Sequence, residues 1–188
     1  MSNRLQIQQT LLSGLIVVKR IAITDQRGQF SRIYCQDELA SVGFDKIWMQ
    51  INYSLTQAQG AVRGLHFQHP PYAEAKMVSC LQGEVFDVAV DIRKDSPTFL
   101  QWHAEVLSAK NGKSFCIPEG FAHGFQTLTE NCELLYFHSA PYQPKYEGAL
   151  NVRDTQIGID WQLPIRELSD RDRAHPSIFE SHFCGIIL

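Results

Sequence analysis

The sequence lacks the paired cysteines that mark a disulfide framework or a structural zinc site. Its five cysteines, at positions 35, 80, 116, 132 and 184, are scattered, odd in number and form no CxxC pair. This pattern favours free thiols in a reducing compartment.

The sequence also lacks a long hydrophobic run. The first ten residues, MSNRLQIQQT, contain no basic segment followed by an extended apolar one, and the apolar run LLSGLIVV is ended by Lys19 and Arg20. A secretory leader needs the first pattern, and a membrane-spanning helix needs about 20 apolar residues. We therefore expect a soluble, cytoplasmic protein that has no membrane partner.

Neither sign of charge is in large excess. The chain has 17 Lys and Arg against 20 Asp and Glu, for a formal net charge of −3. Such a balance gives no reason to expect nucleic acid as a partner. At 188 residues and 44% hydrophobic content, with no repeat or linker-like tract, the chain is expected to form one domain over 1–188.

Short strand-like segments dominate what is present. The pattern predicts a turn over 25–28 and another at Asn111-Gly112, and one short helix over 37–44 that Asp37 caps and Gly43 ends. Strands are predicted over 15–23, 46–56, 99–108, 114–118 and 133–139. Many short strands separated by turns are typical of an antiparallel sandwich or barrel. About thirty C-terminal residues are expected to pack outside it as helical or irregular segments.

The segment 76–93 is predicted to form two strands joined by a hairpin turn at Gln82-Gly83. In its second half, alternation places Phe86, Val88, Val90 and Ile92 on one face. Asp87 and Asp91 share the other face with Val85 and Ala89. Buried carboxylates are costly without hydrogen bonds, so this strand is predicted to border a polar cavity.

The stretch AVRGLHFQHP (61–70) places Arg63 and His66 among apolar residues. Residues three apart do not share a face of a regular strand, but a bulge at Gly64 would let both point inward. By itself this pattern does not decide whether His66 is a functional residue or a histidine packed in the core. In the same way, Lys76 can be a surface cation and Tyr136 can be a core residue.

A metal site is the less favoured interpretation of the histidines. Metal-binding barrels of this type use two histidines one residue apart, and here Gln68 stands where the second would be, followed by His69. Glu119 and His123 could add ligands, but three ligands at metal spacing are missing. We therefore expect no metal.

Five motifs in order make a family resemblance specific. VRGLHFQ, VFDVAVDIRKDSPTFLQW, IPEGFAHGF, ELLY and LSDRD lie between Leu12 and Asp172, and the chain resembles the dTDP-4-dehydrorhamnose 3,5-epimerases. The resemblance implies an all-β fold, a double-stranded β-helix or cupin-like jelly-roll barrel with a few short peripheral helices. It also implies a homodimer in which an N-terminal strand crosses to the partner. The implied enzyme uses no metal or organic cofactor, and its substrate is a nucleotide-linked 4-keto-6-deoxyhexose.

The resemblance also assigns roles to residues. His66 matches the base that removes a proton next to the ketone, and Asp172 matches the carboxylate that fixes the imidazole tautomer. Tyr136 matches the acid on the other face of the sugar, and Lys76 the cation beside the enolate oxygen. Further residues match positions that bind substrate: Arg63, His123, Gln50, Asn52, Arg27 and Phe30, the last of which would stack on the base.

The chain departs from the family at several positions. Arg32 stands where an acidic residue is usual, Leu55 where an Arg is usual, and Phe137 where a Lys is common. A carboxylate can accept the thymine N3–H, whereas a guanidinium can serve the bare N3 of cytosine. Arg32 is therefore a candidate contact to the base, with CDP as the alternative carrier. A second interpretation leaves Arg32 in solvent.

Three other activities stay open at this stage. The chain can be a C3-only or C5-only epimerase, because single and double epimerisation use nearly the same residues. It can also be a 3,4-ketoisomerase, another enzyme built on the same barrel. It can also be a non-catalytic module that binds sugar nucleotides, although the retained His66, Asp172, Tyr136 and Lys76 argue against this.

Overall fold

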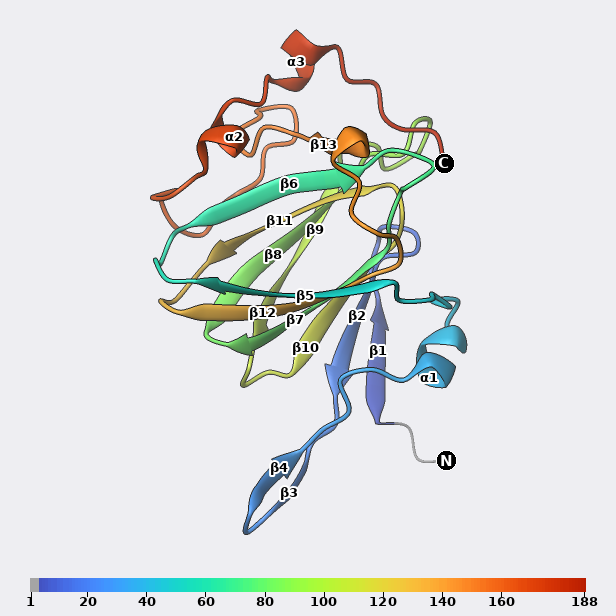
Figure 1. Cartoon of the computed structure of the whole chain (residues 1–188), viewed down its shortest axis with the longest axis vertical. Helices are drawn as coiled ribbons and strands as arrows, with labels where there is room; N and C mark the ends of the chain where they lie inside the picture. Colours follow the sequence, from blue (N-terminus) through green and yellow to red (C-terminus); the bar gives the residue numbers. More distant parts are fainter. Residues whose placement is uncertain (1–3) are drawn as a thin grey trace.

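The computed structural model describes residues 4–188, which form two facing antiparallel sheets (Figure 1). The six-stranded sheet has the order β1 (Leu5–Gln9), β2 (Ile16–Arg20), β10 (Lys113–Ile117), β7 (Lys76–Gln82), β12 (Cys132–His138) and β5 (Gln50–Thr56). The five-stranded sheet has the order β13 (Glu147–Ala149), β6 (Val62–Gln68), β11 (Phe121–Thr127), β8 (Glu84–Asp91) and β9 (Trp102–Ser108).

The connectivity is that of a jelly roll. From β5 to β12, every consecutive pair of strands lies in different sheets except β8 and β9, which pair with each other. The predicted all-β, cupin-like class is confirmed. The predicted hairpin at Gln82-Gly83 is wrong, because β7 and β8 belong to different sheets. Gly83, with φ of +77°, turns the chain from one sheet to the other instead.

Three apolar clusters hold the two sheets and their coverings together. The first fills the space between the sheets and includes Val78, Phe115 and Leu134. The second lies on the outer face of the five-stranded sheet, where Phe86, Val88, Val90 and Ile92 contact the C-terminal segment. The third joins the outer face of the six-stranded sheet to the segment around Leu39 and Phe44. Strand β8 is therefore buried on both faces, in keeping with its alternation.

The helices are short and peripheral. Helix α1 (Gln36–Ala40) starts after Cys35 as N-cap and ends at Ser41, so it is shorter than the predicted 37–44 and is not capped by Asp37. Helices α2 (Asp170–Arg173) and α3 (Ile178–Ser181) lie in the C-terminal segment, as expected, and the 3-10 turn η1 (Pro144–Tyr146) precedes β13. In residues 4–188, no helix has the length and apolar character needed to cross a bilayer.

The remaining predicted strands correspond to observed ones with altered limits. The predicted strand over 15–23 divides into β2 and β3 (Ile23–Asp25), and the predicted turn over 25–28 is the tip between β3 and β4 (Gly28–Phe30). Strands β1, β4, β11 and β13 were not predicted. Strand β11 was missed because Gly124 and His123 within it weaken the strand pattern.

The β3–β4 hairpin projects away from both sheets (Figure 1). All six of its strand residues are exposed, including Ile23 at 45% and Phe30 at 70%. An isolated two-stranded hairpin is marginally stable in water, so this element lacks the packing that the rest of the chain has.

Candidate active site

A cavity of about 550 Å³ opens between the two sheets. Side chains from both sheets line it: Arg63 and His66 from β6, His123 from β11, Lys76 from β7, and Tyr136 and His138 from β12. The structure therefore brings together most of the polar residues that the sequence analysis singled out.

A bulge in β6 lets Arg63 and His66 reach the same cavity. His66 pairs with His123 of β11 and Arg63 pairs with Phe125, so three residue steps on β6 oppose two on β11. Gly64 lies in this irregularity with φ of +135°, and a Cβ there would meet the Gly124 Cα at 2.5 Å. The predicted bulge is confirmed, and the close approach of two backbones requires glycine at this point.

His66 and Asp172 form a hydrogen-bonded pair. The distance from His66 Nε2 to Asp172 Oδ1 is 2.7 Å, and the Asp172 side chain is 4% exposed. Ser169 caps α2 by accepting the Asp172 N–H, which fixes where this carboxylate lies. Burial alone would raise the pKa of Asp172, but the hydrogen bond and charge of His66 lower it below its usual value. Asp172 is thus a carboxylate that orients the imidazole.

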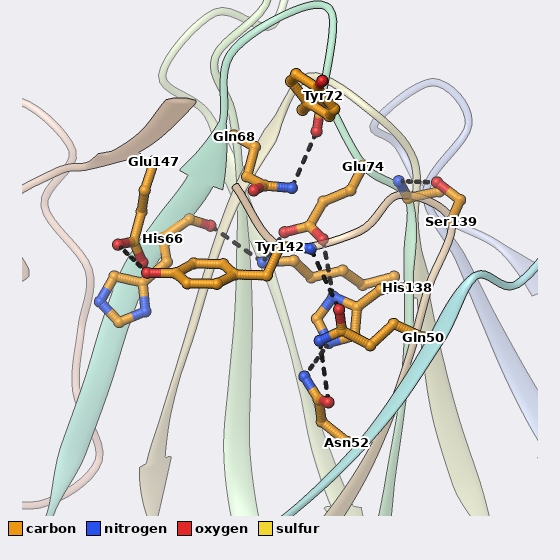
Figure 2. A network of polar contacts seen from close by, with 12 residues as sticks. Gln50, Asn52, His66, Gln68, Tyr72, Glu74, His138, Ser139, Tyr142 and Glu147 are labelled. Carbon is orange, nitrogen blue, oxygen red and sulfur yellow. Dashed lines mark hydrogen bonds and ion pairs between the residues drawn. The ribbon is translucent and has the colours of Figure 1, made fainter. Parts of the chain in front are cut away.

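Arg171 and Glu147 adjoin this pair and were assigned no role in the sequence analysis. Arg171 Nη2 lies 3.3 Å from His66 Nε2, and Arg171 Nη1 donates to Glu147 Oε2 at 2.9 Å. The Tyr142 hydroxyl donates to the same Glu147 oxygen at 2.9 Å. Figure 2 shows Tyr142 and Glu147 beside His66. The position of Arg171 directly before Asp172 in LSDRD was the available signal.

Tyr136 faces the cavity from the opposite sheet. Its hydroxyl lies 3.2 Å from Ser54 Oγ, and its ring lies edge-on to His123 at 6.3 Å between centroids. Burial raises the pKa of Tyr136, while the Ser54 hydrogen bond opposes the rise only in part. The phenol therefore keeps its proton at neutral pH, as a proton donor requires.

Lys76 is buried at the wall of the cavity and is paired with a carboxylate. Its Nζ lies 3.2 Å from Glu74 Oε1 and 3.4 Å from the His66 carbonyl oxygen. The other Glu74 oxygen contacts His138 Nδ1 at 2.8 Å (Figure 2). Neither Glu74 nor His138 was predicted from the sequence, because the two residues are 64 positions apart and meet only through the pairing of β12 with the start of β7.

A second histidine–carboxylate pair lies in the same cavity. His123 Nε2 contacts Asp87 Oδ1 at 2.9 Å, and both side chains are buried. Asp87 therefore fits the predicted polar cavity beside β8. Asp91 does not border it, because its carboxylate binds Arg93, Ser96 and Thr98 in the loop after β8.

The other sequence-predicted contacts are only partly gathered. Asn52 lines the cavity, and Gln50 lies behind it, donating to Asn52 Oδ1 at 3.0 Å. Arg27 and Phe30 lie in the projecting hairpin, away from the cavity, where Arg27 pairs with Asp25. Arg32 lies nearby and its Nη1 is 2.5 Å from Glu38 Oε1.

A second hollow of about 680 Å³ lies behind the His66–Asp172 pair. It shares Arg63, His66 and Arg171 with the first cavity, and Arg166 and Arg173 add further positive charge. Among residues 4–188, no group of three or more His, Cys, Asp or Glu side chains is arranged to hold a metal ion.

The combined geometry suits proton transfer at carbon. One wall carries an imidazole held by a carboxylate, and the opposite sheet carries a protonated phenol and a buried ammonium group. A base, an acid and a cation around one cavity are the groups needed to remove and return a proton next to a carbonyl.

Comparison with known proteins gives consistent matches. The family model of dTDP-4-dehydrorhamnose 3,5-epimerase matches residues 9–180. The dTDP-4-dehydrorhamnose 3,5-epimerase of Salmonella typhimurium is 44% identical over 172 residues, which cover 89% of this chain and 92% of that protein.

Two solved structures are similar over nearly the whole chain. The dTDP-6-deoxy-D-glucose-3,5-epimerase from Legionella pneumophila, in complex with dTDP-4-keto-L-rhamnose, gives a TM-score of 0.90 at 34% identity and covers 98% of this chain and 99% of its own. The 3'-monoepimerase ChmJ from Streptomyces bikiniensis, in complex with dTDP-quinovose, gives a TM-score of 0.86 at 29% identity. The match covers 92% of this chain and 88% of that chain.

Proposed function

Because the chain belongs to the dTDP-4-dehydrorhamnose 3,5-epimerase family, we propose that it inverts C3 and C5 of a thymidine-diphosphate-linked 4-keto-6-deoxyhexose. The enzyme is an isomerase of sugar nucleotides. The observation that supports the chemistry is the His66–Asp172 pair, which faces Tyr136 and Lys76 across one cavity.

The 4-keto group acidifies the C–H bonds on both neighbouring carbons. His66 takes the proton from one of them, the C–H electron pair moves into an enolate, and Asp172 stabilises the imidazolium that forms. Lys76 faces the negative charge that develops on the ketone oxygen. Tyr136 then gives a proton to the opposite face of the same carbon, which inverts it, and solvent restores both groups. The second carbon reacts in the same way.

Thymidine is the proposed carrier, although Arg32 replaces an acidic residue. The Arg32 guanidinium already has an internal partner in Glu38, which also accepts the backbone N–H groups of Arg4 and Leu5. This pairing explains Arg32 without a contact to cytosine, so CDP is the less favoured alternative.

A homodimer with exchanged N-terminal elements is the proposed assembly. The exposed β3–β4 hairpin carries Phe30 and Arg27 far from the cavity of its own chain, which supports their use in a partner's cavity. In addition, the outer face of the edge strand β5 exposes Ile51, Tyr53 and Leu55 at 58%, 58% and 43%. Such an apolar row is typical of a covered interface.

The proposed function is tested by NMR in D₂O, with 4-keto-6-deoxyglucose carried on dTDP or on CDP. We expect deuterium at C3 and C5 and inversion at both carbons with the dTDP sugar, and much slower reaction with the CDP sugar. His66→Asn should fold normally and abolish exchange, because it removes the base.

Three outcomes would contradict this proposal. Exchange at one carbon only would indicate a mono-epimerase, and movement of the ketone to C3 would indicate a 3,4-ketoisomerase. Binding without any exchange would indicate a non-catalytic module.

A further inference from the structure

We propose that Glu74, held in place by His138, is a positioning residue that keeps Lys76 protonated and directed into the cavity. The inference takes the role of Lys76 from the proposed function, and it adds two residues to which no role has been given. It rests on the contacts of the Glu74 carboxylate with its two neighbours.

The side chains of Glu74, Lys76 and His138 are all largely buried. Glu74 is 9% exposed, Lys76 is 8% exposed and His138 is 14% exposed. An ammonium group removed from water is costly unless an opposite charge lies beside it, so an unpaired Lys76 would tend to lose its proton. Glu74 Oε1, at 3.2 Å from Nζ, supplies that charge. Burial alone would raise the pKa of Glu74, but Lys76 and His138 lower it, so the carboxylate stays ionised.

A chain of hydrogen bonds with fixed donors and acceptors reaches His138 (Figure 2). The Tyr142 backbone N–H donates to Gln50 Oε1 at 3.2 Å, and Gln50 Nε2 donates to Asn52 Oδ1 at 3.0 Å. Asn52 Nδ2 then faces His138 Nε2 at 3.4 Å, and His138 Nδ1 faces Glu74 Oε2 at 2.8 Å. The backbone N–H at the start of this chain cannot reverse, so neither amide can flip without placing two donors together.

The fixed directions of these hydrogen bonds favour one form of His138. A neutral His138 with its proton on Nδ1 donates to Glu74 and accepts from Asn52, which satisfies both contacts. An imidazolium would set a second N–H against the Asn52 amide. His138 therefore fixes the Glu74 carboxylate without adding a positive charge, and Lys76 is the one cation paired with it.

Other ionisable groups face the same cavity and contribute to any pH profile. They are His66 and Arg63 from β6, His123 from β11 with Asp87 of β8 behind it, Tyr136 from β12, and Arg171 from α2. The substitutions below leave all of these groups in place. A difference in pH profile between the wild type and a Glu74 variant therefore reports on Lys76 and not on these groups.

The first experiment compares kcat/KM of the wild type and Glu74→Gln between about pH 6.5 and pH 8.5. Loss of the adjacent charge makes Lys76 lose its proton more readily, so the deficit of the variant should grow by about tenfold over this range and appear mainly in kcat. Glu74→Asp, which keeps the charge, should recover most of the activity. A deficit of equal size at both pH values would overturn the proposal.

The second experiment needs no substrate turnover and so separates this inference from the proposed function. Reductive methylation modifies only unprotonated amines, and mass spectrometry reports the labelling rate of each lysine. Lys76 should be labelled about tenfold faster in Glu74→Gln than in the wild type at the same pH. An unchanged rate would overturn the inference even if the enzyme proves to be an epimerase. A faster rate would support it even if the proposed reaction is not observed.

The matched control is a similar triad outside the cavity. Glu105 contacts Lys113 at 2.7 Å and His103 at 3.2 Å. Glu105→Gln should leave both the labelling of Lys76 and the pH profile unchanged.

Variants of His138 cover the case in which Glu74→Gln does not fold. His138→Asn places an amide donor near the Nδ1 position, so Lys76 should be labelled at close to the wild-type rate. His138→Leu removes the hydrogen bond to Glu74 and should speed the labelling of Lys76. Equal labelling in these two variants would overturn the role given to His138.

Discussion

At the scale of single residues, the cavity assigns different tasks to chemically similar groups. Three histidines face it, and each contacts its own carboxylate: Asp172 for His66, Asp87 for His123 and Glu74 for His138. Their other neighbours differ, because Arg171 lies beside the His66 Nε2, whereas His138 contacts the Asn52 amide and its ring stacks on Tyr136. Function therefore follows the surroundings of each imidazole.

Tyr136→Phe is expected to separate proton exchange from inversion. His66 still removes the proton and can return a solvent deuteron to the same face, so deuterium should enter with retained configuration. Inversion should fall by about 10²–10⁴-fold, because the acid on the opposite face is gone. NMR of the substrate pool measures both quantities, and Tyr146→Phe serves as the control outside the cavity. An equal loss of exchange and inversion would contradict the role given to Tyr136.

The sequence predicted the members of the site better than their partners. His66, Lys76, His123 and Tyr136 stand out as polar residues in apolar strands or in family motifs, and all four line the cavity. Glu74, His138 and Arg171 were assigned no role from the sequence. Their contacts depend on strand register and on where the C-terminal segment lies, and a single sequence does not encode these in local spacing.

At the scale of elements, local patterns predicted strands more reliably than their pairing. The alternation in β8 was predicted correctly, yet β7 and β8 are not a hairpin. A glycine turn between two strands looks alike in sequence whether the second strand pairs with the first or crosses to the facing sheet. The sheet order is decided by burial between the sheets, which involves residues distant in sequence.

Asp91, whose carboxylate is bound by the loop after β8, is expected to make the free energy of unfolding fall at acidic pH. Asp91 accepts hydrogen bonds from Arg93, Ser96 and Thr98, and although burial acts the other way, these bonds lower its pKa from 3.8 to about 2. Because the pKa of Asp91 is lower in the folded state than in the unfolded chain, its ionised form stabilises the folded state at pH values above the unfolded pKa. This stabilisation, about 2 kcal/mol after allowing for solvent around the partly exposed Arg93, is lost as the pH falls from about 4 to about 2.

Asp91→Asn should therefore lower the free energy of unfolding at pH 7 by about 2 kcal/mol and flatten its pH dependence in this window. Urea denaturation at several pH values measures both effects. Asp25→Asn is a matched control, since Asp25 pairs with Arg27 at the same spacing but on the exposed hairpin, and it should have no measurable effect. If Asp91→Asn retained the acid sensitivity of the wild type, the assignment to Asp91 would be wrong.

At the scale of the whole molecule, the projecting hairpin predicts how two defective chains complement each other. Phe30→Ala and His66→Asn should each be poorly active alone. In a mixed dimer, one cavity combines an intact His66 with an intact Phe30 from the other chain. After subunit exchange of an equal mixture, half of the dimers are mixed and one site in each is intact, so about a quarter of wild-type activity should return.

The same assay shows whether the β3–β4 hairpin completes the cavity of the partner chain or that of its own chain. If the hairpin served the cavity of its own chain, no intact site would arise. The mixture would then never exceed the mean of the two variants. Analytical ultracentrifugation of Tyr53→Lys, which places a charge on the apolar row of β5, checks separately whether that face holds the dimer together.

The placement of His66 and Tyr136 on facing sheets has a further consequence for how the enzyme can change. The distance between the proposed proton acceptor and the proposed proton donor is set by the thickness of the apolar layer between the sheets, not by any single loop. Phe115, which lies in this layer and does not line the cavity, therefore acts in the proposed reaction as a spacer between His66 and Tyr136. Altered stereochemical outcome can therefore arise from interior substitutions that leave every polar group of the cavity in place.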